Sequence, residues 1–328
     1  MRIIVAPRVL RRFRALNANA NSDEGMRMST NLQDRRAINH GFDPDNGSWV
    51  HRGLDLSEPT SITEEEIAAF KAHYASQFGH SLDGLNWWID QSPEVLKRYR
   101  LYCSLTLRVE PAQTGNGTLT FYALMGHVTG VRYILHSWKT RGVSNAQALE
   151  MLAIAFVHAG PRGMETVAEA AKGIEFDTTP AEPCKFPEGW APDIDAFRSG
   201  IDYSTVDLTA EEKASLYDWY LRTIGEIPPY VRFMAEHRPR LLKTHRSRIE
   251  NMLYVLPKQF WPTTMLYYHV MSRTAEGIRE NVLLCKAWGV TKSDALDTIG
   301  NALVYGQMEA ATMVQNEAGD IFDGWQDR

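Results

Sequence analysis

The chain has 328 residues, of which 44% are hydrophobic and 23% are charged, and its formal net charge is −5. This length and composition are typical of a globular protein with room for two domains, and the weakly acidic balance gives no reason to expect a nucleic-acid partner. No stretch approaches the roughly 18–20 apolar residues of a membrane helix, so we expect no membrane partner. The three cysteines, Cys103, Cys184 and Cys285, are far apart, which argues against a disulfide framework and favours a reducing cytoplasm.

The first 20 residues carry five arginines and no acidic residue, and they end in a run of alanines and asparagines. An arginine-rich, acid-poor start is typical of a transit peptide. We favour the simpler interpretation that residues 1–55 form a disordered or extended segment. Translation from Met26 or Met28 is a further alternative, because it would make the preceding residues an artefactual extension.

The second half of the chain repeats the first. Shifted by 146 positions, ITEEEIAAFKAHYASQFG (62–79) lies over LTAEEKASLYDWYLRTIG (208–225). After a one-residue insertion, GVRYILHSWKTRGVSNAQAL (130–149) lies over GIRENVLLCKAWGVTKSDAL (277–296). Such regular spacing indicates an internal duplication. We therefore predict a repeat over 56–173, a proline-rich linker over 174–207, a second repeat over 208–320 and a tail over 321–328.

Both repeats have the sequence pattern of helices, with apolar residues recurring every three or four positions. The expected helix starts are marked by capping hydroxyls or by a first-turn proline: Thr63, Thr209, Pro93, Pro239, Ser144 and Thr291. The acidic run of residues 64–66 is interpreted as a solvated helix start. Residues 104–124 could pass for a strand hairpin, but we predict a loop and a helix there. The predicted fold is all-α, with two tandem helical domains.

Several short motifs resemble those of one helical family. They are the segments from Gly130-Val-Arg to Gly142-Val-Ser and from Gly277-Ile-Arg to Gly289-Val-Thr, the turns VHAGP (157–161) and VYGQ (304–307), and LPKQFWP (256–262). Together they resemble the carboxymuconolactone decarboxylase / alkylhydroperoxidase D (AhpD) superfamily over residues 62–173 and 208–320. The resemblance implies an all-α fold, and it leaves the reaction open because the superfamily hosts several.

The peroxidase chemistry of that superfamily is not expected here. The resemblance places its Cys-x-x-Cys-x-x-x-His motif on His127, Gly130 and Ile134 in the first repeat. In the second repeat it places the motif on Thr274, Gly277 and Asn281. Because neither repeat has a thiol at these positions, no nucleophile is present to attack a peroxide.

The decarboxylase branch agrees better with the sequence. Its helix arginine corresponds to Arg132 and Arg279, and a guanidinium is a suitable partner for a substrate carboxylate. The branch's helix histidine is replaced by Ile134 and Asn281, so a histidine elsewhere would have to transfer the proton.

Three histidines are candidates for that role. His127 occupies the position of the family's first cysteine, and His158 replaces the tyrosine of the turn, where the second repeat keeps Tyr305. His269 follows Tyr268 on a segment leading to Arg279, so these rings could line an aromatic-substrate site. Each histidine also fits a structural role. Because the repeats differ at these positions, we expect one asymmetric site, in the first repeat.

The functional prediction is a cofactor-independent lyase of the decarboxylase type. It would act on a small carboxylated or lactone compound, with Arg132 or Arg279 binding the carboxylate, Tyr268 and Tyr305 contacting the substrate, and His127, His158 or His269 moving a proton. No metal site is expected, since the histidines are scattered. A homo-oligomer is expected, with Trp87 and Trp88 at an interface or in the core. The alternative is a non-catalytic oligomeric binding or scaffold protein.

Overall fold

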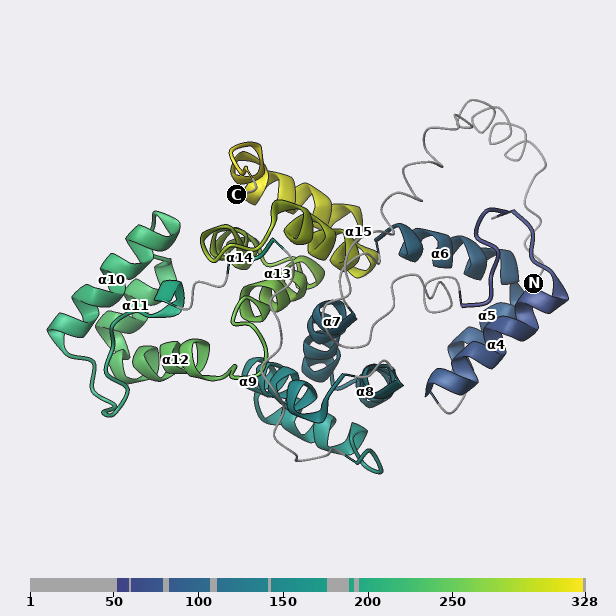
Figure 1. Cartoon of the computed structure of the whole chain (residues 1–328), viewed down its shortest axis with the longest axis horizontal. Coiled ribbons are helices and arrows are strands. Elements are labelled where there is room, and N and C mark those ends of the chain that lie inside the picture. Colours follow the sequence, from purple (N-terminus) through teal and green to yellow (C-terminus); the bar gives the residue numbers. More distant parts are fainter. Residues whose placement is uncertain are drawn as a thin grey trace, which may run out of the picture. The chain divides into compact units, whose positions relative to one another are not determined.

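A computed structural model describes residues 52–58, 60–78, 83–106, 111–140, 143–175, 189–191 and 195–326, without the side chains of 104–106, 111–116 and 140. All of them belong to one compact unit spanning residues 36–328. The described residues form twelve α-helices and one short 3-10 helix, without a strand (Figure 1). The all-α prediction is therefore confirmed for this part of the chain. None of its helices combines the length and the apolar character needed to cross a bilayer.

The helices follow one order twice. The first series is α4 (Glu64–Phe78), α5 (Asp83–Gln91), α6 (Pro93–Thr106), α7 (Pro111–Met125), α8 (Val128–Thr140) and α9 (Asn145–Ala170). After η1 (Asp195–Phe197), the second is α10 (Ala210–Ile224), α11 (Pro229–His237), α12 (Pro239–Asn251), α13 (Phe260–Ser272), α14 (Ala275–Ala287) and α15 (Lys292–Asp323). Helices α10, α11 and α12 begin 146 residues after α4, α5 and α6, and α14 and α15 begin 147 residues after α8 and α9. These are the shifts at which the sequence repeats.

The predicted helix starts are confirmed. Thr209 caps α10 through a reciprocal pair of bonds with Glu212, and Thr63 makes the same pair with Glu66. Ser144 caps α9 and Thr291 caps α15. Prolines occupy the first position of α6 and of α12, where the missing N–H costs no hydrogen bond. Residues 111–125 form a helix, as we preferred over a hairpin.

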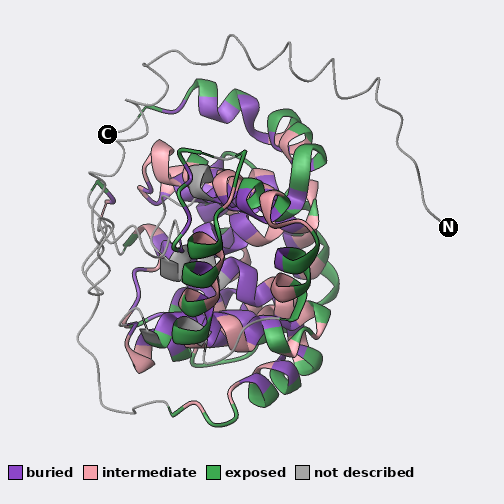
Figure 2. Ribbon diagram, turned by 90° about the vertical axis from the view of Figure 1, so that its right-hand side faces the viewer, coloured by how far each residue is buried: buried purple, intermediate pink, exposed green. Residues whose placement is uncertain are grey.

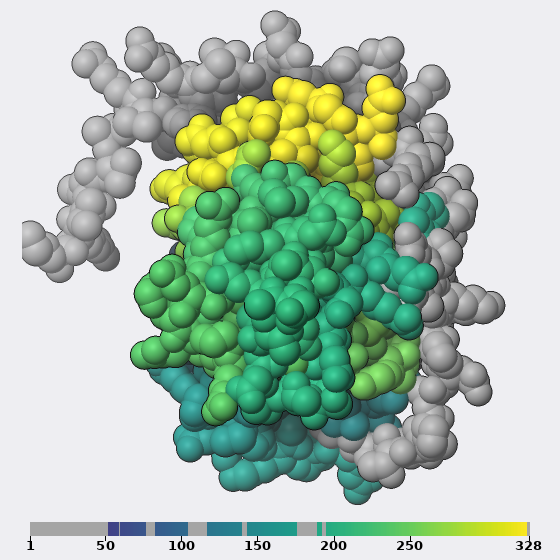
Figure 3. All heavy atoms as spheres, turned by 90° about the vertical axis from the view of Figure 1, so that its left-hand side faces the viewer, coloured from purple at the N-terminus to yellow at the C-terminus, as the bar shows by residue number. Residues whose placement is uncertain are grey.

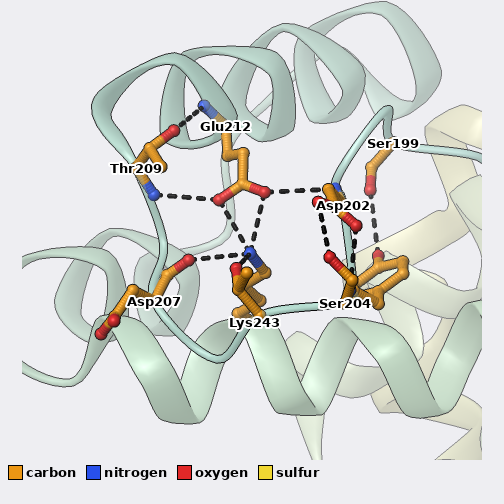
Figure 4. Close-up of polar contacts among 9 residues, drawn as sticks. Ser199, Asp202, Ser204, Asp207, Thr209, Glu212 and Lys243 are labelled. Atoms are coloured by element: carbon orange, nitrogen blue, oxygen red, sulfur yellow. Dashed lines mark hydrogen bonds and ion pairs between the residues drawn. The ribbon is translucent and has the colours of Figure 1, made fainter.

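A buried lysine lies under each capped start. The ammonium of Lys243 donates to both carboxylate oxygens of Glu212, at 2.8 and 2.9 Å, and to the carbonyl of Asp207 at 2.7 Å (Figure 4). In the first series Lys97, also buried, binds Glu66 at 2.6 Å. The prediction of a solvated start is therefore wrong for Glu66, since this carboxylate both caps the helix and neutralises a buried cation. It holds for residues 64 and 65, which are exposed.

One large hydrophobic core joins the two predicted repeats. It draws side chains from α7, α8 and α9 and from α10 to α15, while a smaller cluster lies among the residues of α4, α5 and α6. Helices α7 and α13 contact each other, and each packs on the last helix of its own series, α9 or α15. Figure 2 shows the buried positions gathered toward the inside of the helical assembly and the exposed ones toward its outside. The repeats thus share one interior, since neither central helix is covered by its own series alone.

The last helix of each series is kinked at the same place. Gly160 in α9 has φ 61° and ψ −153°, and Gln307 in α15 has φ 62° and ψ −166°. This backbone region is populated almost only by glycine. His158 and Tyr305 each lie two residues before the kink of their helix. Both side chains therefore stand in the last helical turn before the kink.

The segments outside the repeats are only partly described. Most of the predicted N-terminal segment lies outside the described residues, but residues 52–55 pack on α4, with Leu54 buried. In the predicted linker, Phe197 packs on Trp288 at 4.2 Å, and the four linker prolines lie outside the described residues. The predicted tail continues α15, and Trp325 is buried against Phe322.

Candidate functional site

A cluster of aromatic and imidazole rings forms where α9 meets α13. The ring of His158, on α9, lies 5.0 Å from that of Tyr268, 6.0 Å from that of His269 and 6.3 Å from that of Trp261, measured between ring centroids. All three neighbours are on α13, and Tyr268 and His269 are themselves 5.1 Å apart. Three residues that the sequence singled out, His158, Tyr268 and His269, therefore lie together.

A glycine of α14 makes room for the ring of His269. A Cβ atom added at Gly277 would lie 2.3 Å from Cγ and Nδ1 of His269. In the first repeat Gly130 is equally close to the rings of His127 and Tyr122. The Gly-x-Arg motif of each repeat thus begins with a residue that must lack a side chain, because an aromatic ring occupies the space.

Helix α12 adds two further groups to the cluster. His245 and Arg248 are three residues apart, so they share one face of the helix. The charge of His245 is influenced by His158 and Arg248, which indicates that these groups are in its vicinity. The ring of His245 is 6.0 Å from that of Tyr230 on α11. The site thus combines one side chain from the first repeat with several from the second. We call His158, His245, Arg248, Trp261, Tyr268 and His269 the histidine cluster.

The three histidines are held in the neutral form. Burial, together with the positive charge of Arg248, lowers the pKa of His158 to about 4. The same two causes, with smaller effects of His158 and Arg246, lower the pKa of His245 to about 4. Burial and the neighbouring His158 lower that of His269 to about 4. At neutral pH each imidazole is a proton acceptor rather than a cation.

A protonatable carboxyl lies beyond His245. Burial raises the pKa of Glu280, on α14, to about 7. Its Oε1 accepts a hydrogen bond of 2.9 Å from the hydroxyl of Tyr230, whose own pKa is raised well above 10 by burial. Tyr230 therefore stays protonated and donates, while Glu280 gains and loses its proton around neutrality. Such a carboxyl suits acid and base catalysis at physiological pH.

The equivalent positions of the other repeat are mostly tyrosines. At the 146 or 147 shift, the histidines 158, 245 and 269 correspond to Tyr305, Tyr99 and Tyr122, and Glu280 corresponds to Tyr133. The ring of Tyr122 is 6.4 Å from that of Tyr305 and 5.0 Å from that of His127. The structure thus places the predicted residues His127 and Tyr305 together, but in this second, tyrosine-rich cluster.

The two predicted arginines bind helix ends. Arg132 donates to the carbonyl of Glu169 at 3.1 Å, near the end of α9, and Arg279 donates to the carbonyl of Glu317 at 2.8 Å, in the last part of α15. Both roles are the same in the two repeats. A guanidinium on the last carbonyls of a helix is a common C-terminal stabilising contact. We therefore exclude both arginines from the site.

The expectation of a site in the first repeat needs correction, because only His158 of the histidine cluster comes from it. Sequence reasoning also missed His245, Arg248, Trp261 and Glu280. The alignment of the two predicted repeats carries the missing signal. His245 and Glu280 are both ionisable side chains at positions where the first repeat has a tyrosine.

Among the described residues, no three side chains of the metal-binding types are grouped to hold an ion. Two described cysteines, Cys103 and Cys285, are free and buried.

Comparisons with protein-family models, curated proteins and solved structures give no match for this chain.

Proposed function

We propose that the chain is a cofactor-independent lyase of the carboxymuconolactone decarboxylase type and a tandem two-repeat member of that superfamily. Its substrate would be a small carboxylated or lactone compound, and thiol-peroxidase chemistry is not part of the proposal. The observation that carries it is the convergence of His158, His269 and Tyr268, three of the residues chosen from the sequence, on one cluster.

The reaction needs two kinds of group. When the bond to the carboxyl carbon breaks, CO2 leaves and the electron pair passes into an enolate, which then takes up a proton on carbon. The Tyr268 hydroxyl, whose pKa is raised by burial, stays protonated and can donate to the enolate oxygen. His158 and His269 exchange the proton, and the Nδ1 of His269 is buried without a hydrogen-bond partner among the described residues.

The flat rings favour an unsaturated substrate. Trp261 is buried at one side of His158, and Tyr268 lies at another with its ring nearly perpendicular to the imidazole. Aromatic walls exclude water and accept planar groups, which strengthens each hydrogen bond formed between them. A lactone or an aromatic carboxylate meets these requirements.

The proposal is tested by offering the purified chain a panel of small carboxylated lactones, carboxymuconolactone among them, in D2O. Carbon NMR should show release of the carboxyl carbon as CO2, and proton NMR should show deuterium at the product carbon that takes up the proton. His158→Ala and His269→Ala should each slow turnover by about 10²-fold or more. The matched control is His237→Ala, because His237 is half-exposed at the end of α11 and should leave the rate unchanged.

Unfolding free energies of the same variants separate chemistry from folding. Histidines that serve the reaction can be removed at a cost of about 1 kcal/mol or less. No turnover or deuterium incorporation with any lactone or carboxylate of the panel would refute the lyase. A stability loss of several kcal/mol in both alanine variants would instead assign them a structural role.

A non-catalytic oligomeric scaffold is the second candidate, and one observation favours it. Trp87 and Phe233 are exposed at equivalent positions of α5 and α11, and Val95 and Leu241 at equivalent positions of α6 and α12. Figure 3 faces the side of the chain formed by α10 to α12, the helices to which Phe233 and Leu241 belong. Exposed apolar groups at matching places suit subunit contacts, so we propose a homo-oligomer, which light scattering would test. A monomer at micromolar concentration would contradict it.

A further inference from the structure

Arg248 differs from the other arginines around the histidine cluster in having no anionic partner. Its Nε is buried without a hydrogen-bond partner, and no carboxylate of the described residues lies within ion-pair distance of it. Arg246, two positions earlier on α12, pairs with Glu250 at 2.6 Å and also donates to the carbonyl of Phe197. An unpaired, half-buried guanidinium is costly unless something else satisfies it.

The groups on whose charge Arg248 acts are two imidazoles, those of His158 and His245. His245 shares its face of α12, and the ring of His158, on α9, contacts the rings of Tyr268 and His269. Glu280 is bonded to Tyr230 and is influenced by Arg246 and Glu226 rather than by Arg248. The carboxylate of Glu150, on α9, accepts hydrogen bonds from the backbone N–H groups of residues 254–256, just after α12. In the described part of the chain, the positive charge of Arg248 therefore has no paired counter-ion.

From this arrangement we propose that Arg248 is the anion-binding residue of the histidine cluster, and that the bound carboxylate brings a proton onto His158 or His245. The guanidinium offers donors in the planar fork that matches a carboxylate. It takes over the role that sequence reasoning gave to Arg132 and Arg279. The inference rests on the proposed function in that the bound anion would be the substrate's carboxylate.

The proton coupling follows from the sign of the charges. Arg248 is one of the two causes that keep the pKa of His158 at about 4, the larger being burial. A bound carboxylate cancels the field of Arg248 and attracts a proton itself, so the pKa of His158 rises on binding. The bound state then holds more protons than the free state, and anion affinity must increase as the pH falls from about 6.5 toward 4. The protonated imidazole is also the acid that protonation of an enolate carbon requires.

Binding of benzoate, with benzamide as the neutral counterpart of the same shape, tests both parts without turnover. Calorimetry at pH 5.5 in two buffers of different ionisation enthalpy measures affinity and proton uptake together. We expect benzoate to bind with uptake of a fraction of a proton, and benzamide to bind more weakly. Arg248→Met should lower benzoate affinity roughly 10–100-fold and remove the uptake, and Arg248→Lys should retain part of both.

Arg240→Met is the matched control, since Arg240 lies on the same helix and pairs with Asp207 on the surface. It should bind benzoate as the unaltered chain does. NMR of the imidazole protons of the unaltered chain adds a reading that needs no variant, because benzoate should raise the pKa of His158 or His245. Benzoate binding that is equal in Arg248→Met, or that leaves all histidine pKa values unchanged, would overturn the proposal.

The two proposals fail in different ways. Benzoate binding that depends on Arg248, without turnover of any lactone, would remove the lyase and leave the anion site. Turnover that Arg248→Met leaves at its normal KM and kcat would remove Arg248 and leave the lyase.

Discussion

The ring of His269 and the backbone at Gly277 occupy space that only glycine permits, and Gly277→Ala tests this directly. Alanine normally stabilises a helix position by about 1 kcal/mol relative to glycine. Here the added Cβ would lie 2.3 Å from Cγ and Nδ1 and 2.5 Å from Cδ2 of His269. Those atoms lie at the base of the ring, so the side chain must turn about its first torsion to make room.

Overpacking of this kind costs about 1–3 kcal/mol. After the propensity gain of about 1 kcal/mol, the net effect should be a loss of up to about 2 kcal/mol in unfolding free energy. Gly300→Ala is the control, because nothing lies within 4 Å of the added Cβ in α15, and it should stabilise the chain by about 0.5–1 kcal/mol.

Urea unfolding followed by circular dichroism measures both variants, provided that the slope of free energy against urea stays constant. A displaced imidazole should also slow the proposed reaction by about 10²-fold. The reasoning fails if Gly277→Ala gains stability as Gly300→Ala does, since the ring would then not occupy the space that the structure assigns to it.

Three further predictions concern stability. Gln307→Gly should raise the unfolding free energy by about 1 kcal/mol, since the release of a strained φ of 62° outweighs the added flexibility of glycine. Gly160→Ala should lower the unfolding free energy, and a change of the same sign in both variants would contradict this reasoning. Glu280→Gln should leave the unfolding free energy unchanged at pH 4 and raise it by up to about 3 kcal/mol at pH 8. The reason is that a carboxyl whose folded pKa is about 7 contributes stability below its unfolded pKa, and this stability is lost as the pH rises through 7. A gain already complete at pH 4 would refute the assignment. Lys243→Met should lower the unfolding free energy by about 3 kcal/mol, because it leaves Glu212 without its cation. Adding Glu212→Gln to this variant should restore part of the loss, whereas simple additivity of the two changes would show that the residues are not coupled.

Local structure was predictable from the sequence where neighbouring residues decide it. Thr209 and Glu212 lie three positions apart and satisfy each other at the start of α10, so the pair could be read without knowing the fold. The proline at the start of α12 acts in the same local way. By contrast, the burial of Glu66 was not predictable, because its partner Lys97 lies 31 residues away on another helix. A residue pattern in one helix cannot show which distant charge will pack on it.

The site shows the same division between local and distant effects. The helical class followed from residue order alone, and so did the choice of His158 and His269 as candidates. Which side chains meet did not, because α9 of the first repeat packs its histidine against α13 of the second, and the tertiary structure alone decides that contact. The roles of the arginines were also decided there. Arg132 and Arg279 are the arginines that the family resemblance singled out, yet they bind helix carbonyls. Arg248 shares one face of α12 with His245 and acts on the charge of that imidazole.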